Sequence, residues 1–197
     1  MVPERKYLIH PSFIVLALIL FAITSLFLAF SISYIYTRID RGLVAIQLPY
    51  LFYINAIILF FSSRFLSLAK KAYFKDETQP FKFNIFLSLI LAVVFMLSQV
   101  VAWNQMMNEN LFIGYSNMTS FIYLLSGAHL LHVLGGIPFL AFFYIESLKY
   151  MKDPVTVFIY FSDVTKLRRL RLISIYWHYL DILWIYLILF FLINTFI

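Results

Sequence analysis

The sequence of 197 residues contains no cysteine, which excludes disulfide bonds, thiolate metal sites and a cysteine nucleophile. Charged residues make up only 12% of the chain, against roughly 25% in typical soluble domains. Glycine and proline, which interrupt the helices of many transporters, number only five and six. By contrast, hydrophobic residues make up 63% and aromatic residues 20%. This composition is typical of an integral membrane protein.

Five apolar segments are each long enough to cross a bilayer, for which about 20 residues suffice. They cover residues 11–37, 43–66, 83–103, 119–145 and 172–196. The first segment is too long for a signal-peptide core and no small-residue cleavage site follows it, so we expect it to remain in the mature protein. With no internal repeat and no polar segment long enough to fold alone, we predict an all-α, polytopic membrane helix bundle with five transmembrane helices, forming a single domain over residues 1–197.

The net charge of +6 comes from lysines and arginines that lie mostly in short segments between the apolar runs; Arg64, near the end of the second run, is counted with the segment that follows it. Thirteen of the fifteen fall on alternate segments, which share one side of the membrane, and two fall on the other side. The positive-inside rule then places the N-terminus in the cytoplasm and the C-terminus outside. We expect the longest connection, 146–171, to be a loop in which Lys166, Arg168, Arg169 and Arg171 form a lipid-facing collar. These roles account for the charge, and we expect no nucleic-acid binding.

The last apolar segment contains two ionisable residues three positions apart, His178 and Asp181. An ionisable side chain at the centre of a spanning helix costs roughly 2.5–3.5 kcal/mol on insertion scales, so it is kept when it is paired or functional. We favour a structural clamp to the segment 119–145 over a proton relay, because no ladder of acids continues across the bilayer. Trp177 and Trp184 are seven residues apart and share one helix face, which indicates packing or partner contact.

The fourth apolar segment carries His129 and His132, one turn apart, followed by Gly135 and Gly136. Small residues of this kind favour the close approach of a neighbouring helix. Histidines at this spacing can bind a metal from one helix face, but no carboxylate accompanies them in the helix interior, so we favour hydrogen bonding. The widely spaced histidines of a transmembrane di-haem protein are also missing, and we expect no haem ligation by this chain.

The rise of 1.5 Å per residue gives an approximate depth for each polar side chain in the membrane. His132 and Asp181 fall at similar depths near the middle. Gln99 on the third segment falls level with His129. Asn55 on the second segment falls level with Asp181. We therefore expect interhelical hydrogen bonds between the members of these pairs.

Together these motifs resemble those of subunit III of the haem-copper terminal oxidases. The run Tyr-Trp-His-Tyr-Leu-Asp-Ile-Leu-Trp at 176–184 is similar to the signature of that family's last helix. The run Gly-Ala-His-Leu-Leu-His-Val-Leu-Gly-Gly at 127–136 resembles its Gly-x-His-x-x-His-Val-x-x-Gly helix. Five helices match the shorter bacterial form of the family. Further similar positions are Gln99 and Trp103 on the third segment, and Leu48, Pro49, Asn55, Ser62 and Ser63 on the second.

The resemblance implies an accessory subunit in the bacterial inner (cytoplasmic) membrane that binds no haem or copper itself. Its partners would be catalytic subunit I and subunit II, which hold the haem and copper, pass electrons from cytochrome c to dioxygen and translocate protons. It also implies phospholipids bound in a cleft, and membership in a larger respiratory supercomplex stays open. The residues expected to have structural roles are Gln99, Trp103, His129, His132, Gly135, Gly136, Trp177, His178, Asp181 and Trp184.

Two features depart from the pattern of that family. The segment 11–37 has no acidic residue where the family usually has a buried carboxylate, and residues 171–174 lack the acid that usually precedes the aromatic motif. A proton-antenna role is therefore not carried over. Two alternatives stay open within related complexes: subunit III of a quinol oxidase, and the partner of a nitric oxide reductase. A small transporter or channel is the alternative from another class, for which broken helices or inverted repeats are expected.

Overall fold

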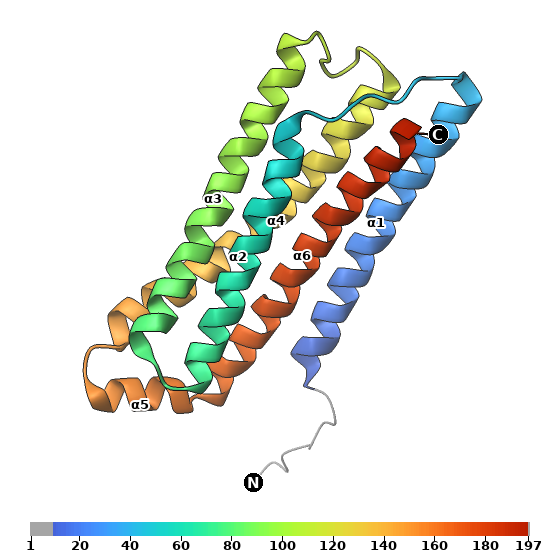
Figure 1. Ribbon diagram of the computed structural model, residues 1–197. Helices are drawn as coiled ribbons and strands as arrows, with labels where there is room; N and C mark the ends of the chain where they lie inside the picture. The colour runs from blue at the N-terminus through green and yellow to red at the C-terminus, as the bar shows by residue number, and fades with distance from the viewer. Residues whose placement is uncertain (1–9, 197) are drawn as a thin grey trace.

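The computed structural model describes residues 10–196, and every regular element among them is an α-helix. Five helices are long and apolar enough to cross a membrane, which confirms the predicted number of spans and a multi-pass membrane protein. Figure 1 shows these five side by side, with a short sixth helix across one end. The helices are α1 (Pro11–Arg41), α2 (Tyr50–Phe74), α3 (Thr78–Asn108), α4 (Asn117–Tyr150), α5 (Pro154–Ser162) and α6 (Val164–Phe196).

The second span begins at Tyr50 and not at residue 43 as predicted. Gly42 ends α1 in the left-handed conformation, with φ 60° and ψ 35°, which glycine adopts without strain. Residues 43–49 then cross the end of the bundle without helical structure, and α2 begins directly after Pro49 (Figure 1). Proline is unfavourable in a helix interior because it removes a backbone donor and clashes with the preceding turn. Apolar composition alone does not distinguish such a segment from a helix.

The prediction that residues 146–171 form a loop is wrong. This stretch contains the end of α4, all of α5 and the first two turns of α6. Pro154 occupies the first turn of α5, and Asp153 and Thr156 form a reciprocal capping box there. The Asp163 carboxylate then accepts a hydrogen bond from the Thr165 backbone N–H at 2.8 Å and begins α6. The nine residues of α5 are too short to cross a membrane and escape a search for spanning helices.

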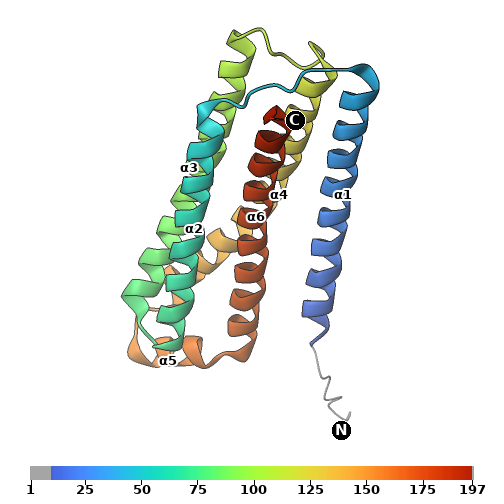
Figure 2. The same cartoon turned by 45° about the vertical axis from the view of Figure 1, so that its right-hand side comes forward.

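The last helix occupies the middle of the bundle. It packs against α1, α2 and α4 along its length and contacts α5 near its start. Helices α2 and α3 form an antiparallel hairpin and pack closely along each other. Helix α1 packs against α4 and α6 and stands at one side of the bundle in Figure 2. Polar side chains on α6 are therefore within reach of three other spanning helices.

The beginnings of α1 and α6 lie at the same end of the bundle as α5 (Figure 1). A hydrogen bond of 2.6 Å between the Arg168 guanidinium and the His10 imidazole joins the two helix starts. The basic residues predicted as a collar therefore lie on the first turns of α6 and not in a loop. Arg5 and Lys6, which contributed to the predicted orientation, lie outside the described residues.

Candidate functional site

The face of α6 that packs on α2 carries both tryptophans of the last motif. The Trp177 indole N–H donates to the Ser62 hydroxyl at 3.1 Å. Two turns further along α6, the Trp184 indole N–H donates to the Phe52 carbonyl at 3.3 Å. Both indoles are only 1% exposed. The spacing of seven residues thus places two large, hydrogen-bonded rings in the seam between α2 and α6.

The His178 imidazole lies between two hydroxyl groups of α2. Ser67 is 3.2 Å from its Nε2 atom, and Ser63, one turn earlier, contacts its Nδ1 atom. Asp181 is buried one turn along α6, beside the Ser63 hydroxyl, and its Oδ1 atom has no hydrogen-bond partner among residues 10–196. These two ionisable residues therefore belong to the α2–α6 seam.

The predicted pairing of Asp181 with His132 is wrong, as is the clamp of His178 and Asp181 onto α4. Depth along the membrane gives the level of a side chain but not the direction in which it points around the helix. Asp181 faces α2, whereas the His132 ring lies beside Phe27 of α1 at a centroid distance of 6.0 Å. The imidazole Nδ1 of His132 contacts the Ala128 carbonyl of its own helix at 2.6 Å.

The other two depth-based pairings are also wrong. Gln99 does not bond His129: its side-chain carbonyl accepts from the Asn55 amide at 2.8 Å, which joins α2 to α3. Asn55 is therefore engaged with α3 and not with Asp181. His129 instead bonds the Leu180 backbone carbonyl through Nε2 at 3.0 Å. Asn55, Gln99 and His129 are all fully buried, so these bonds are shielded from solvent.

Aromatic rings from three other helices pack around Trp184 in the interior of the bundle. Its indole stacks on Phe52 of α2 with centroids 5.6 Å apart and an interplanar angle of 19°. The Phe95 ring of α3 meets it edge-on at 5.2 Å, and the His129 ring of α4 lies 4.8 Å away. Four helices thus meet at one tryptophan, and edge-on and stacked geometries of this kind add to the packing energy.

The two glycines of α4 face different environments. A Cβ atom built on Gly136 would lie 2.7 Å from the Trp177 ring, so only glycine permits this approach of α6. A Cβ atom on Gly135 would meet nothing within 4 Å. Nearby, the Tyr176 hydroxyl donates to the His132 carbonyl at 2.9 Å. The α4–α6 contact therefore depends on Gly136, Tyr176 and His129 together with Leu180.

Polar residues of α1 bind α6, although the sequence analysis assigned them no partner. The three α6 residues that make these contacts are seven or eight positions apart and therefore share one face of the helix. They are Thr24 with Tyr179 at 2.8 Å, Ser31 with Tyr186 at 2.8 Å, and Arg38 with Asn194 at 3.2 Å. The regular spacing of these residues along α6 indicates a shared partner helix. The chain has 14 tyrosines, however, so the sequence does not single out these two as contacts of α1.

The third helix is joined to the fourth through Trp103. Its indole N–H donates to the Ser126 hydroxyl at 3.0 Å, and its ring lies 3.8 Å from a Cβ atom built on Gly127. Within residues 10–196, no three His, Cys, Asp or Glu side chains gather closely enough to hold a metal ion. Most of the candidate residues instead take part in contacts between helices, whereas His132 bonds within its own helix and Gly135 faces open space.

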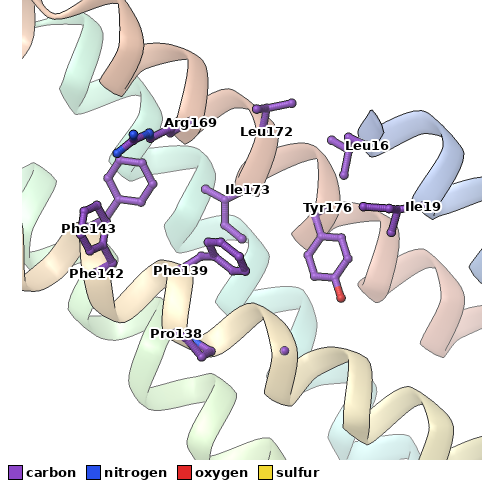
Figure 3. A pocket seen from close by; sticks show the side chains of 11 residues that line it. Leu16, Ile19, Pro138, Phe139, Phe142, Phe143, Arg169, Leu172, Ile173 and Tyr176 are labelled. Atoms are coloured by element: carbon purple, nitrogen blue, oxygen red, sulfur yellow. The ribbon is translucent and has the colours of Figure 1, made fainter. Parts of the chain in front are cut away.

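An apolar groove of about 710 Å³ lies between α1, α4 and α6. Figure 3 shows its aliphatic and aromatic walls, with the Arg169 guanidinium at one end. Gly135 and Pro138 line it on α4, and Leu16 and Ile19 line it on α1. A long, apolar groove that ends at a cation has the chemistry to hold an acyl chain below an anionic headgroup.

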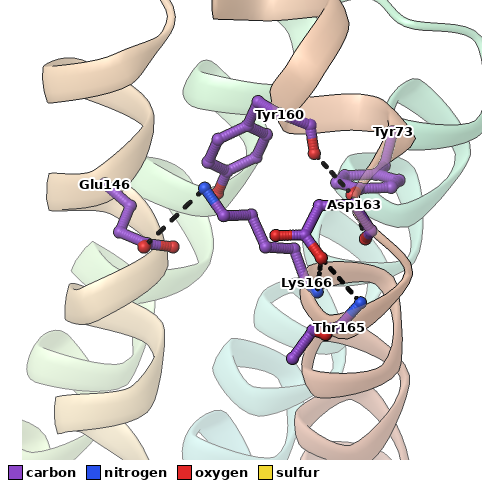
Figure 4. Close-up of polar contacts among 6 residues, drawn as sticks. All are labelled: Tyr73, Glu146, Tyr160, Asp163, Thr165 and Lys166. Carbon is purple, nitrogen blue, oxygen red and sulfur yellow. Dashed lines mark hydrogen bonds and ion pairs between the residues drawn. The ribbon is translucent and has the colours of Figure 1, made fainter. Parts of the chain in front are cut away.

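At the end of the bundle that carries α5, Lys166 is held in a cluster of aromatic rings and one acid (Figure 4). Its ammonium lies 3.8 Å from the centre of the Tyr160 ring and 3.8 Å from the Glu146 carboxylate. The Tyr73 hydroxyl donates to the Tyr160 carbonyl at 3.0 Å. Burial raises the pKa of the Tyr160 hydroxyl above its usual 10.0, and the Glu146 carboxyl raises it further. This cluster fixes α5 against α2, α4 and α6.

No protein-family model matches the chain, and no curated protein sequence matches it. Its functional assignment therefore depends on the residues and contacts described above.

The two glycines of α4 provide a matched pair of variants. Gly136→Ala should destabilise the purified protein by about 1–3 kcal/mol, because its methyl group would overlap the Trp177 ring. Gly135→Ala should leave stability unchanged or slightly raised, since the methyl group meets open space and alanine favours helix. Thermal unfolding in mild detergent measures both. Equal losses of stability in the two variants would contradict the packing described here.

The Tyr160 ring and hydroxyl can be separated by substitution. Tyr160→Phe keeps the ring beneath Lys166 and removes a buried hydroxyl that has no partner among the described residues, so stability should be unchanged or raised. Tyr160→Leu removes the ring and should cost about 1–2 kcal/mol through the lost cation–π contact and packing. The same thermal unfolding assay compares them; a loss in Tyr160→Phe as large as that in Tyr160→Leu would refute the role of the ring.

Proposed function

We propose that this chain is the accessory, non-redox subunit III of a proton-pumping haem-copper oxygen reductase, a cytochrome c oxidase of a bacterial aerobic respiratory chain. Electron transfer to dioxygen and proton translocation take place in the complex, and this chain is not catalytic. Its role is to stabilise catalytic subunit I and to hold phospholipid. Haem and copper belong to the partner subunits.

The observation that carries the proposal is the contact between Gly136 and Trp177. The two segments that most resemble subunit III, 127–136 and 176–184, are distant in sequence, and their glycine and tryptophan interlock in the bundle. Other residues of the same segments, His129 and Trp184, pack against each other. A subunit whose distinctive residues form buried pairs between helices supports a scaffold role over a redox role.

A cytoplasmic N-terminus and an external C-terminus are part of the proposal. The start of α1, all of α5 and the start of α6 share one end of the bundle, and this end carries Arg168, Arg169 and Arg171. Lysine and arginine concentrate on the cytoplasmic side of membrane proteins. The distribution of basic residues therefore supports placing this end in the cytoplasm of the bacterial inner membrane.

The described helices also bear on the alternative of a small transporter or channel. A transporter site is typically built from helices that break near the middle of the membrane. Here α4 continues through Pro138, and the other four spanning helices are likewise continuous over their described lengths. Continuous helices with mutually paired polar side chains favour the scaffold. Quinol oxidase and nitric oxide reductase complexes differ from a cytochrome c oxidase in their partner subunits, so the partner decides between them.

Affinity purification of the tagged chain from native membranes in mild detergent tests the proposal. We expect a large haem-containing subunit I to co-purify, with haem bands in the reduced-minus-oxidised spectrum. A second partner with a soluble copper-binding domain would identify a cytochrome c oxidase, and one without it a quinol oxidase. Recovery of the chain without haem protein, from membranes that contain an active oxidase, would overturn the proposal.

Phospholipid in the groove between α1, α4 and α6 is the second part of the proposed role. Arg169→Gln should lower the amount of anionic phospholipid that co-purifies with the chain, because the guanidinium at the end of the groove is lost. Arg171→Gln is the matched control, since it removes the same charge two residues further on, beside Phe74 and away from the groove. Native mass spectrometry measures bound lipid. Equal lipid loss in both variants would show general surface attraction and no groove site.

A further inference from the structure

A single arginine lies on the outward face of α2, close to the middle of this spanning helix. Helix α2 runs from Tyr50 to Phe74, so its midpoint is residue 62, and Arg64 is exposed two residues beyond it. Among residues 10–196, no hydrogen bond or ion pair reaches the Arg64 guanidinium. An ionisable side chain at this depth is costly when it faces lipid, and in membrane proteins it almost always has a partner.

The level of the basic collar can be read from the structure. The Arg171 guanidinium lies over the Phe74 ring at 5.7 Å, which places the collar at the end of α2. Arg64 is ten residues from Phe74 and seven from Lys71, or about 15 Å and about 10 Å along the helix axis. Both distances are longer than an extended arginine side chain. The guanidinium therefore does not reach the collar, where lipid phosphates lie.

Side-chain direction adds to this separation. In an α-helix the Cα–Cβ bond tilts toward the N-terminus of the helix. For Arg64 that direction points away from Phe74, the nearer end of α2, and toward Tyr50, fourteen residues distant. The side chain thus starts away from the nearer membrane surface. Lipid headgroups are accordingly a poor partner for this cation on either side.

The surface around Arg64 is suited to a packed helix. Phe60 and Phe61, one turn before it, are 59% and 49% exposed, and Ile57 continues the same stripe at 57%. Ser67, one turn after it, holds the half-buried His178 imidazole in the adjacent seam with α6. The face therefore combines exposed aromatic and aliphatic side chains with one cation.

We infer that this outer face of α2 is the docking surface for a membrane-spanning helix of the catalytic subunit, and that this helix places an Asp or Glu side chain opposite Arg64. An ion pair formed in this setting is shielded from water and salt, and it fixes the depth at which the two helices meet. The identity of the partner rests on the proposed function; the need for an acidic, helix-borne partner rests on the position of Arg64.

Charge reversal at Arg64 tests the inference in the full chain, expressed with its complex. Arg64→Glu should reduce the recovery of catalytic subunit at least tenfold, and Arg64→Gln should reduce it by a smaller factor, since it removes attraction without adding repulsion. Lys71→Glu is the matched control: it lies seven residues on along the same exposed stripe, at the level of the collar, and should change recovery less than twofold. Thermal unfolding of each purified variant checks that the chain itself still folds.

A photo-crosslinking residue at Phe60 gives a second, independent readout that does not require assembly to fail. We expect a cross-link to a spanning segment of the catalytic subunit with an Asp or Glu within about one turn of the attachment point. Leu97, which is 64% exposed on α3, is the comparison position. A cross-link from position 97 and none from position 60, or cross-linking of position 60 to lipid alone, would overturn the inference.

The two proposals fail in different ways. If the wild-type chain recovers the haem-containing subunit and Arg64→Glu recovers it equally, the docking surface is wrong and the proposed function stands. If the wild-type chain recovers no haem protein, the proposed function fails and the inferred partner fails with it.

Discussion

The Trp177 indole lies where three helices meet, and the rest of the bundle depends on how it is held. Its ring fits against α4 at Gly136, where an added Cβ atom would collide with it. Its N–H donates to Ser62 on α2, and that hydroxyl in turn donates to the Ser88 carbonyl on α3 at 2.9 Å. Lipid is as apolar as the helix surfaces, so close packing and hydrogen bonds decide helix association in a membrane. One side chain here provides both.

The number of spans and their approximate positions follow from hydrophobicity, because bilayer thickness sets the length of each apolar segment. The fine structure depends on features that hydrophobicity does not contain. Pro49 delays the second helix by seven residues relative to its apolar segment, and α5 is apolar yet too short to be recognised as a span. Both errors lie at the ends of spanning helices, where backbone chemistry and not membrane thickness decides the structure.

The residues of the candidate site could be selected from the sequence, but their partners could not. Each buried polar residue stands out because burial in hydrocarbon without a partner is costly. Depth along the helix is only one of the coordinates that determine a contact, and it does not predict that His178 turns toward α2 while His129 turns toward α6. Backbone carbonyls such as that of Leu180 carry no signal in the sequence at all.

The polar contacts of α1 have a consequence for the order in which the bundle can form. Thr24, Ser31 and Arg38 all bind residues of α6. Because α1 precedes α6 in the chain, α1 finds these polar partners only after α6 has been made. Before that, α1 can pack on α4, but its contacts with Tyr179, Tyr186 and Asn194 cannot form, so docking of α1 onto α6 is a late step of assembly. The groove between α1, α4 and α6 is lined by all three helices, so it is complete only after that same late step.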